Sequence, residues 1–298
     1  MKTAVGFIGL GTMGASMAMN VIRKGFPLII TTSSNKKGND FEKAGATVVS
    51  TPSEVAQNAR IIVTCVPDIF AMKTIVSGPD GIASRKWHNG LLLDCSTISP
   101  SEILELSTLL SGVGARVIDA PVSGGNKGAR NGTLTIMCGG EKLFVERARE
   151  VLEAMGTNIH HVGPLGSGQT LKACNQLMVA INMMGAYEAI ALARAAGIDP
   201  TLMREVLSTG AARSGVLEGH ALRYIDNDLQ GGFRAELLNK DLGIAKSTGD
   251  QLKCIQPATI LAHQLIQATC NGGFSNLDSA ALGLLYDRLN GISDEDKA

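Results

Sequence analysis

The sequence predicts an α/β domain followed by an all-α domain, the two joined by a long helix. Apolar runs of strand length alternate with helical patterns over the first half of the chain, and strand-like runs disappear after the stretch GPLGSG. The chain has 298 residues, of which 45% are hydrophobic, enough for two buried cores. We therefore place the domains at 1–164 and 165–298.

The first predicted strand, Val5 to Ile8, leads into three glycines and then a helix from Ala15 to Lys24. Gly9, Gly11 and Gly14 have the GxGxxG spacing of Rossmann-type dinucleotide-binding domains. There the first glycine permits a tight turn, the second lets a pyrophosphate approach the backbone, and the third lets helix and strand pack closely. Free N–H groups at the helix start face the phosphates. The stretch predicts a dinucleotide site.

The second strand, Pro27 to Thr31, ends where such a domain contacts the adenosine ribose. An acidic residue there accepts hydrogen bonds from the ribose hydroxyls and repels a 2′-phosphate. This chain has Thr32 and Ser33 at that point, followed by Lys36 and Lys37. Because hydroxyl donors and positive charge favour a phosphate, we predict NADP as the cofactor, with NAD possible.

Further strands and helices continue the alternation. The strands are Ala46 to Val49, Ile61 to Val66, Leu91 to Asp94, Arg116 to Asp119, Leu134 to Cys138 and Asn158 to Val162; the helices are Pro52 to Ala59, Ser101 to Leu110 and Glu141 to Met155. The carboxyl ends of parallel strands meet at one edge, where ligands bind. We therefore expect Val66, Pro67 and Thr97 to line the cofactor site. Capping the next helix together with Ser99 is the other role open to Thr97.

Small residues follow the sixth strand. Ser123, Gly124 and Gly125 form a stretch whose backbone N–H groups can converge on an anion, and a substrate carboxylate is the expected guest. A plain glycine turn leading to the next strand is the alternative interpretation.

The sequence predicts only helices in the second domain. They are Gln169 to Ala196, Pro200 to Leu207, Leu237 to Leu252, Pro257 to Cys270 and Asp278 to Leu289. Lys172, Asn175 and Gln176 have the spacing i, i+3, i+4 and project from one face of the long helix. A lysine in a first helical turn is disfavoured as a cation by the helix dipole, which suits a proton donor. A solvated surface lysine is the alternative.

Composition narrows the class of partner. Lysine plus arginine equal aspartate plus glutamate at 27 each, so we expect no nucleic-acid partner. The six cysteines are spread singly along the chain, so we expect them to be reduced and buried in the core. No cluster of residues with metal-ligand spacing appears, so we expect no metal. With no signal peptide and no uninterrupted apolar stretch of spanning length, we expect a cytoplasmic protein without a membrane contact. Long apolar faces on the helices of the second domain indicate that part of this domain is buried between subunits of a homo-oligomer.

Five blocks together resemble the β-hydroxyacid dehydrogenase family, the group of 3-hydroxyisobutyrate dehydrogenase and related semialdehyde reductases. They are GFIGLGTMG, DCSTISP, DAPVSGGNKGA, GSGQTLKACNQ and NKDLGIA, in the family's order and spacing over essentially the whole chain. The resemblance implies NAD(P)-dependent interconversion of a small β-hydroxy acid and its semialdehyde.

The resemblance also implies residue roles. Gly9, Leu10, Gly11, Thr12, Met13 and Gly14 hold the pyrophosphate; Thr97 lies by the nicotinamide; Ser123, Gly124 and Gly125 bind the substrate carboxylate; Lys172 is the catalytic general acid and base; Lys240 closes over the cofactor. The family often has Asn four residues after the lysine, where this chain has Gln176, with Asn175 one residue earlier. Both amides are therefore candidates for binding substrate.

Two other functions are weighed against this one. A 6-phosphogluconate dehydrogenase-like enzyme shares the lysine, but it calls for a histidine at the position of Asn175 and a much longer helical domain. A catalytically silent dinucleotide-binding module that serves oligomerisation is the other, and loss of Lys172 would mark it. The lysine is present.

Overall fold

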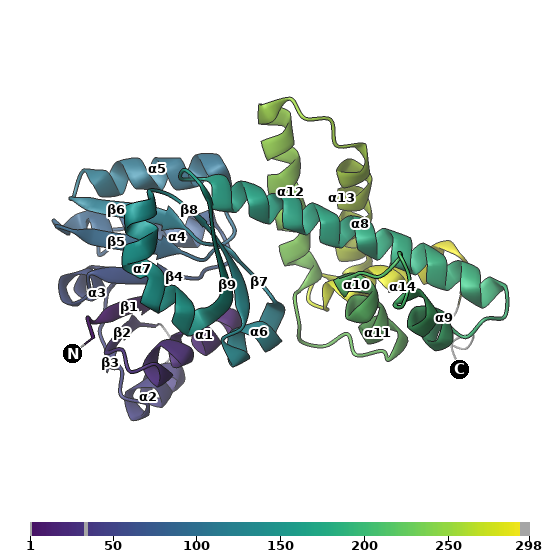
Figure 1. Ribbon diagram of the computed structural model, residues 1–298, viewed down its shortest axis with the longest axis horizontal. Helices are drawn as coiled ribbons and strands as arrows, with labels where there is room; N and C mark the ends of the chain where they lie inside the picture. The colour runs from purple at the N-terminus through teal and green to yellow at the C-terminus, as the bar shows by residue number, and fades with distance from the viewer. Residues whose placement is uncertain (1, 33–34, 293–298) are drawn as a thin grey trace. The chain divides into compact units, whose positions relative to one another are not determined.

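The structure, a computed structural model, describes residues 2–32 and 35–292 (Figure 1). Ser33, predicted at the adenosine ribose, lies outside the described residues. The chain divides into two compact units, Met1–Lys172 and Ala173–Ala298. The boundary falls within one helix, five residues after its first residue, Ser167.

The first unit is built on a sheet with the strand order β3-β2-β1-β4-β5-β6-β8-β7, in which β9 also pairs with β8. The strands are β1 (Val5–Ile8), β2 (Leu28–Thr31), β3 (Thr47–Val48), β4 (Ile61–Thr64), β5 (Gly90–Asp94), β6 (Ala115–Asp119), β7 (Val122–Ser123), β8 (Leu134–Gly139) and β9 (Gly156–Gly163). Strands β1 to β6 are parallel, whereas β8 runs antiparallel to β6 and β7. The strand order reverses at β1, the point where doubly wound sheets bind ligands.

Helices cover both faces of this sheet (Figure 1). They are α1 (Thr12–Arg23), α2 (Asn35–Lys43), α3 (Pro52–Asn58), α4 (Ile69–Ser77), α5 (Pro100–Ser111), α6 (Gly125–Asn131) and α7 (Lys142–Met155), with a 3₁₀ turn at Ile82–Ser84. One core holds side chains of α1, α6 and α7, and the other holds side chains of α3, α4 and α5. Central strands buried on both faces need continuous apolar runs, which is why they were predictable. The predicted α/β Rossmann-type fold is confirmed.

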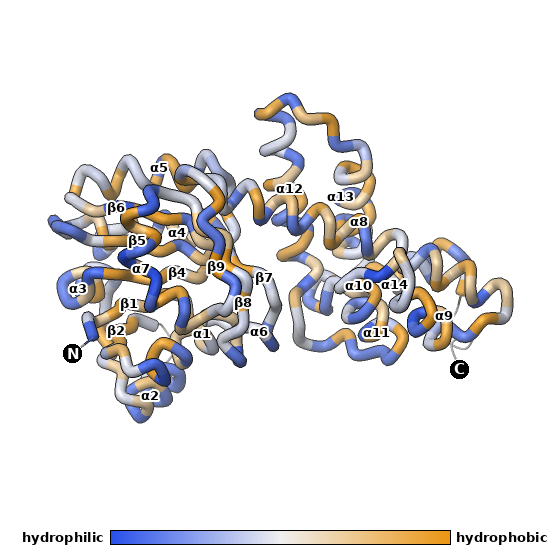
Figure 2. Tube along the Cα trace, in the orientation of Figure 1, coloured by the Kyte–Doolittle hydropathy of each residue, from blue (hydrophilic) through white to orange (hydrophobic). Residues whose placement is uncertain are grey.

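Three helices of the first unit were not predicted from the sequence, namely α2, α4 and α6. Helix α2 is largely hydrophilic along its length (Figure 2), and Phe41 is its one fully buried apolar side chain. Helix α4 begins after Asp68, whose carboxylate accepts a hydrogen bond from the Ala71 N–H at 2.8 Å. Helix α6 is rich in glycine and asparagine, so propensity gives it little signal. Packing against neighbouring elements stabilises all three: β3 for α2, α5 and the 3₁₀ turn for α4, and mainly α1 for α6.

The described residues of the second unit form helices and no strand beyond one isolated β-bridge between Arg234 and Asp278, which confirms the predicted all-α domain. The helices are the remainder of α8 (Ser167–Ala195), α9 (Pro200–Leu207), α10 (Gly215–Glu218), α11 (His220–Ile225), α12 (Ala235–Leu252), α13 (Pro257–Thr269) and α14 (Leu282–Leu289), with short irregular turns at Cys270–Phe274 and Ser279–Ala281. The short helices α10 and α11 were not predicted, and α14 begins four residues later than Asp278. Tyr187, 1% exposed, packs its ring against Tyr224 and Tyr286 in the core.

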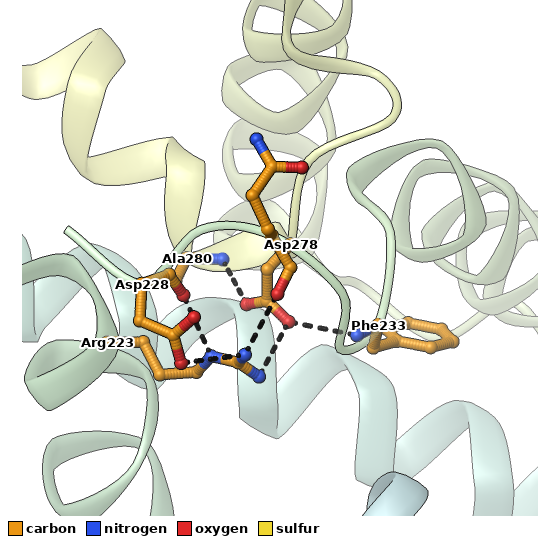
Figure 3. A network of polar contacts seen from close by, with 6 residues as sticks. Arg223, Asp228, Phe233, Asp278 and Ala280 are labelled. Atoms are coloured by element: carbon orange, nitrogen blue, oxygen red, sulfur yellow. Dashed lines mark hydrogen bonds and ion pairs between the residues drawn. The ribbon is translucent and has the colours of Figure 1, made fainter.

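A buried carboxylate fixes the segment that leads into α12 (Figure 3). Asp278, 2% exposed, accepts hydrogen bonds from the N–H groups of Phe233 and Ala280, each at 2.9 Å, and from the Arg223 guanidinium at 3.3 Å. Gly232 has φ +69°, and a Cβ there would lie 1.8 Å from Asp278 Oδ2. The network therefore ties the segment before α12 to the turn Ser279–Ala281 that precedes α14, and at position 232 only glycine fits beside it.

Among the described helices, only α8 is long and apolar enough to cross a membrane by length and composition. In its most apolar stretch of 18 residues, 44% is buried inside the protein. Its side chains Ala180, Met183 and Ile190 belong to the core of the second unit, and this accounts for the apolar composition. None of the six cysteines forms a disulfide. Cys174 and Cys254 are exposed, so the expectation that the cysteines are core residues is wrong for these two.

Candidate active site

The glycine turn after β1 divides its roles among three positions. Gly9 has φ +101°, and a Cβ there would lie 2.3 Å from the carbonyl oxygen of Cys65. A Cβ on Gly14 would lie 1.9 Å from the carbonyl oxygen of Gly9, so helix and turn touch only because that atom is missing. A Cβ on Gly11 would meet nothing within 4 Å. The fold therefore requires the first and third glycines, whereas the second faces open space that a ligand can fill.

Helix α1 presents its first N–H groups beside this space. The helix begins at Thr12, three residues earlier than predicted, so Thr12, Met13 and Gly14 form its first turn. Gly11 is its N-cap and supplies no side-chain hydrogen bond to those N–H groups. Uncapped donors at the positive end of a helix suit a pyrophosphate, so the residues present fit a dinucleotide. Lys37 of α2 reaches this turn, because its ammonium donates to the Leu10 carbonyl oxygen at 2.6 Å.

Polar contacts connect the ends of β4 and β5. Asp94 Oδ1 accepts hydrogen bonds from the Thr64 hydroxyl at 2.9 Å and the Ser96 N–H at 3.0 Å. The Ser96 hydroxyl in turn accepts from the Val66 N–H at 3.0 Å. This chain of contacts fixes the two segments predicted to line the cofactor, one carrying Val66 and the other Thr97.

The pH dependence of stability provides a test of the Asp94 carboxyl. Complete burial raises its pKa from 3.8 to about 6, against the opposing hydrogen bonds from Ser96 and Thr64. The pKa of Asp94 is therefore higher in the folded than in the unfolded protein. The contribution of this carboxyl to the free energy of unfolding is fully present below its unfolded pKa and is lost as pH rises through about 6. We expect the free energy of unfolding of the wild type to fall by roughly 3 kcal/mol relative to Asp94→Asn across this window.

Chemical denaturation of both proteins at intervals between pH 4 and pH 7 measures that difference. Asp94→Asn preserves a hydrogen-bond acceptor for Thr64 and Ser96. The pH dependence of its free energy of unfolding therefore differs from that of the wild type only by the titration of this carboxyl. Parallel pH curves for the two proteins would contradict the assignment.

The start of α8 is held by two buried residues of the first unit. Asp119, at the end of β6, accepts hydrogen bonds from the N–H groups of Gly166 and Gln169, each at 2.8 Å. The Gln169 amide donates to the Ser96 carbonyl oxygen at 2.8 Å and accepts from the Ile98 N–H at 3.3 Å. Gln169 thus hydrogen-bonds to the backbone on both sides of Thr97.

Lys172 lies one helical turn beyond Gln169 and is the last residue of the first unit. It is 8% exposed, which disagrees with the alternative of a solvated surface lysine. The helix begins at Ser167, two residues earlier than predicted, so Lys172 stands in its second turn. The expected effect of the helix dipole is therefore weaker than the sequence suggested, because that effect decays within the first turn.

In the second unit, a buried aspartate connects the other predicted residues. Asn175 donates to the Gln176 side-chain oxygen at 2.7 Å, and the Gln176 amide donates to Asp241 Oδ2 at 2.7 Å. The Lys240 ammonium lies 3.2 Å from Asp241 Oδ1. Asp241, 2% exposed, thus gathers both candidate amides and Lys240 of α12 into one group.

The predicted carboxylate loop is a turn between β7 and α6. Ser123 ends β7 and is partly buried, and Gly124 and Gly125 have φ of +129° and +58°. A Cβ on Gly125 would meet nothing within 4 Å. The loop therefore leaves room beside Gly125, and its binding role stays a prediction.

Sequence reasoning missed Asp94, Asp119, Gln169 and Asp241. The sequence could have indicated the first two, because each is an aspartate that directly follows the buried apolar residues of a strand. A charge buried in a sheet must have hydrogen-bond partners. No group of three or more metal-ligating side chains suited to a metal occurs within the residues described by the structure.

Sequence models of two protein families match the chain in succession. The NAD binding domain of 6-phosphogluconate dehydrogenase matches residues 4–163. The NAD-binding domain of NADP-dependent 3-hydroxyisobutyrate dehydrogenase matches residues 166–286. Together these matches span most of both units.

Characterised relatives are similar over nearly the full length. Mitochondrial 3-hydroxyisobutyrate dehydrogenase of Mus musculus is 38% identical over 291 residues, covering 94% of this chain and 86% of that enzyme. The 2-hydroxy-3-oxopropionate reductase of Escherichia coli is 37% identical over 278 residues, covering 93% and 95%. The solved structure of Mycobacterium tuberculosis 3-hydroxyisobutyrate dehydrogenase with L-serine is 29% identical, covers 96% and 99%, and superposes with a TM-score of 0.85. The chain belongs to the β-hydroxyacid dehydrogenase family of NAD(P)-dependent oxidoreductases, which act on CH–OH groups.

Proposed function

We propose that this oxidoreductase reversibly interconverts a small β-hydroxy acid and its semialdehyde, with Lys172 as general acid and base. The observation that carries the proposal is the pair of hydrogen bonds between the Gln169 amide and the backbone on both sides of Thr97, one donated to Ser96 and one accepted from Ile98. These bonds attach the helical turn that precedes Lys172 to the segment predicted to line the nicotinamide. A buried amine one helical turn beyond this attachment is suited to proton transfer at a substrate oxygen.

Each group has one task in this mechanism. The bound nicotinamide supplies the hydride to the carbonyl carbon in reduction and accepts it in oxidation. The Lys172 ammonium donates a proton to the carbonyl oxygen in reduction, and the neutral amine takes it back in oxidation. Ser123, Gly124 and Gly125 bind the carboxylate, and Asn175 or Gln176 orients the rest of the substrate. No metal is needed to polarise the carbonyl in this scheme.

The relatives narrow the substrate class. The names 3-hydroxyisobutyrate and 2-hydroxy-3-oxopropionate both denote short carboxylic acids with oxygen at carbon 3, and the L-serine of the solved relative is another. The second family match, to 3-hydroxyisobutyrate dehydrogenase, favours this class over a 6-phosphogluconate-like substrate. We therefore propose a carboxylate with a three-carbon backbone as the substrate.

A panel of semialdehydes and β-hydroxy acids, each assayed with NADH and NADPH or their oxidised forms, tests this function. We expect turnover with at least one short carboxylate and a drop of about 100-fold in kcat/KM for its methyl ester, because the ester lacks the charge that the 123–125 loop binds. Equal turnover of acid and ester would contradict the loop's role. Cofactor binding without any turnover would favour the catalytically silent module.

We also propose NADP as the preferred cofactor, because Lys37 of α2 follows the strand end where such domains bind the adenosine ribose and would supply positive charge to a 2′-phosphate. Lys37→Ala is expected to lower kcat/KM for NADPH by about tenfold while leaving the value for NADH unchanged, since only the former loses a charge-assisted contact. Lys43→Ala, at the other end of α2, is the matched control for the lost charge. An equal fall with both cofactors would contradict this preference.

We propose further that the enzyme is a homodimer or homotetramer of the cytoplasm. Leu192, Leu202 and Val206 of the second unit are 72%, 53% and 58% exposed, which is unusual for large apolar side chains. The free cysteines agree with a reducing compartment.

A further inference from the structure

We propose that Asp119 and Gln169 are positioning residues for the reaction: together they hold the first turn of α8 against the strand ends and so set where Lys172 presents its amine. This inference rests on the proposed role of Lys172. Neither residue needs to touch the substrate or the cofactor for its effect.

Asp119 acts as the N-cap of a helix that has no capping side chain of its own. The residue before α8 is Gly166, which has no side chain to offer. The Asp119 carboxylate, contributed by β6 and fully buried, instead takes the Gly166 N–H on Oδ1 and the Gln169 N–H on Oδ2. A Cβ on Gly139 or Gly168 would lie 2.4 Å or 2.8 Å from its oxygens, so two glycines leave the space that this carboxylate occupies.

Gln169 adds a second attachment of different chemistry. Its side chain is 1% exposed and uses both ends of the amide, the nitrogen toward the Ser96 carbonyl and the oxygen toward the Ile98 N–H. Only an amide of this length both donates and accepts at this site. The first turn of α8 is therefore bound to β6 through Asp119 and to the segment around Thr97 through Gln169.

Both attachments precede Lys172 by one turn of a rigid helix. Residues three apart in an α-helix lie on the same side and are separated by roughly 4.5 Å along the axis. A shift of the first turn is therefore transmitted to the Lys172 backbone almost undiminished. Because misplacement of a reacting group by about 1 Å can slow catalysis roughly 100-fold, loss of the attachments should appear in the chemical step.

The test compares Gln169→Leu with Thr170→Ala in the full-length enzyme. Thr170 donates its hydroxyl to the Gly166 carbonyl at 2.9 Å, so its loss removes a hydrogen bond from the same turn without touching the segment around Thr97. For each variant we would measure kcat, the Kd of the cofactor, the melting temperature and the primary deuterium isotope effect with cofactor deuterated at the transferred position.

For Gln169→Leu we expect kcat to fall by about 10- to 100-fold, the isotope effect on kcat to rise toward its intrinsic value, and the cofactor Kd to stay within about twofold. Thr170→Ala should keep the wild-type isotope effect and kcat. Gln169→Glu, which is the same size but sets a carboxylate oxygen against the Ser96 carbonyl, and Asp119→Asn should show the same isotope signature as Gln169→Leu.

A variant of Gln169 or Asp119 that melts earlier yet retains kcat and the wild-type isotope effect would overturn the inference, because the role would then be only structural. If Gln169→Leu does not fold, Gln169→Glu and Asp119→Asn decide the question by the same criteria. Failure of the proposed function is a separate outcome: it appears as an inactive wild type or an active Lys172 variant.

Discussion

Lys172→Met is expected to lower kcat in both directions by about 10²- to 10⁴-fold while leaving the Kd of the cofactor unchanged. Methionine fills a similar volume with an unbranched chain, so the buried position stays packed and only the amine is lost. The glycine turn proposed to bind the cofactor follows β1, a different element of the chain, and this substitution does not alter it. Steady-state kinetics and fluorescence titration of the reduced cofactor measure the two effects.

Lys172→Arg distinguishes proton transfer by the amine from a role of its positive charge alone. Arginine keeps the positive charge but stays protonated, so it cannot complete a cycle of proton donation and uptake. We expect this variant to be as inactive as Lys172→Met if proton transfer is the role, and partly active if the charge alone matters. Lys142→Met, at the start of α7 and outside every predicted site, controls for removal of a lysine. More than a tenth of wild-type kcat in Lys172→Met would refute the assignment.

The glycine turn gives the second large effect, and it separates folding from binding. Gly14→Ala places a methyl group 1.9 Å from the Gly9 carbonyl oxygen. Because that oxygen belongs to the backbone, no side-chain rotation can relieve the clash. We expect a loss of at least about 3 kcal/mol of stability, or an insoluble protein. Gly11→Ala meets no protein atom within 4 Å, so this variant should fold with a melting temperature near that of the wild type.

For Gly11→Ala we nevertheless expect cofactor binding to weaken by roughly 100-fold, because its methyl group fills the space that the pyrophosphate needs. Thermal melting and cofactor titration on both variants test the pair. The glycine assignment fails if Gly11→Ala binds the cofactor as tightly as the wild type, or if Gly14→Ala is as stable as Gly11→Ala.

Much of the first unit was predictable because the signals are local. The central strands are continuous apolar runs, and the GxGxxG spacing marks one turn by its own residues. The start of helix α5 is indicated by Ser99 and Glu102, which form a capping box, and by a proline at the first helical position. By contrast, α2 and α6 have weak helix propensity and few buried side chains. Packing stabilises them, against β3 for α2 and mainly against α1 for α6.

The sequence by itself determined the two-domain fold class, the dinucleotide turn and, through its motif blocks, the family. These properties depend on residues that are neighbours along the chain or on patterns repeated within one element. The tertiary structure decided how Asp119 caps a helix 47 residues away and how Gln169 reaches back to Ser96 and Ile98. It also brought Gln176 to Asp241 across 65 residues. Such contacts follow from the packing of separate elements, and a buried polar group reveals its partner only when that packing is known.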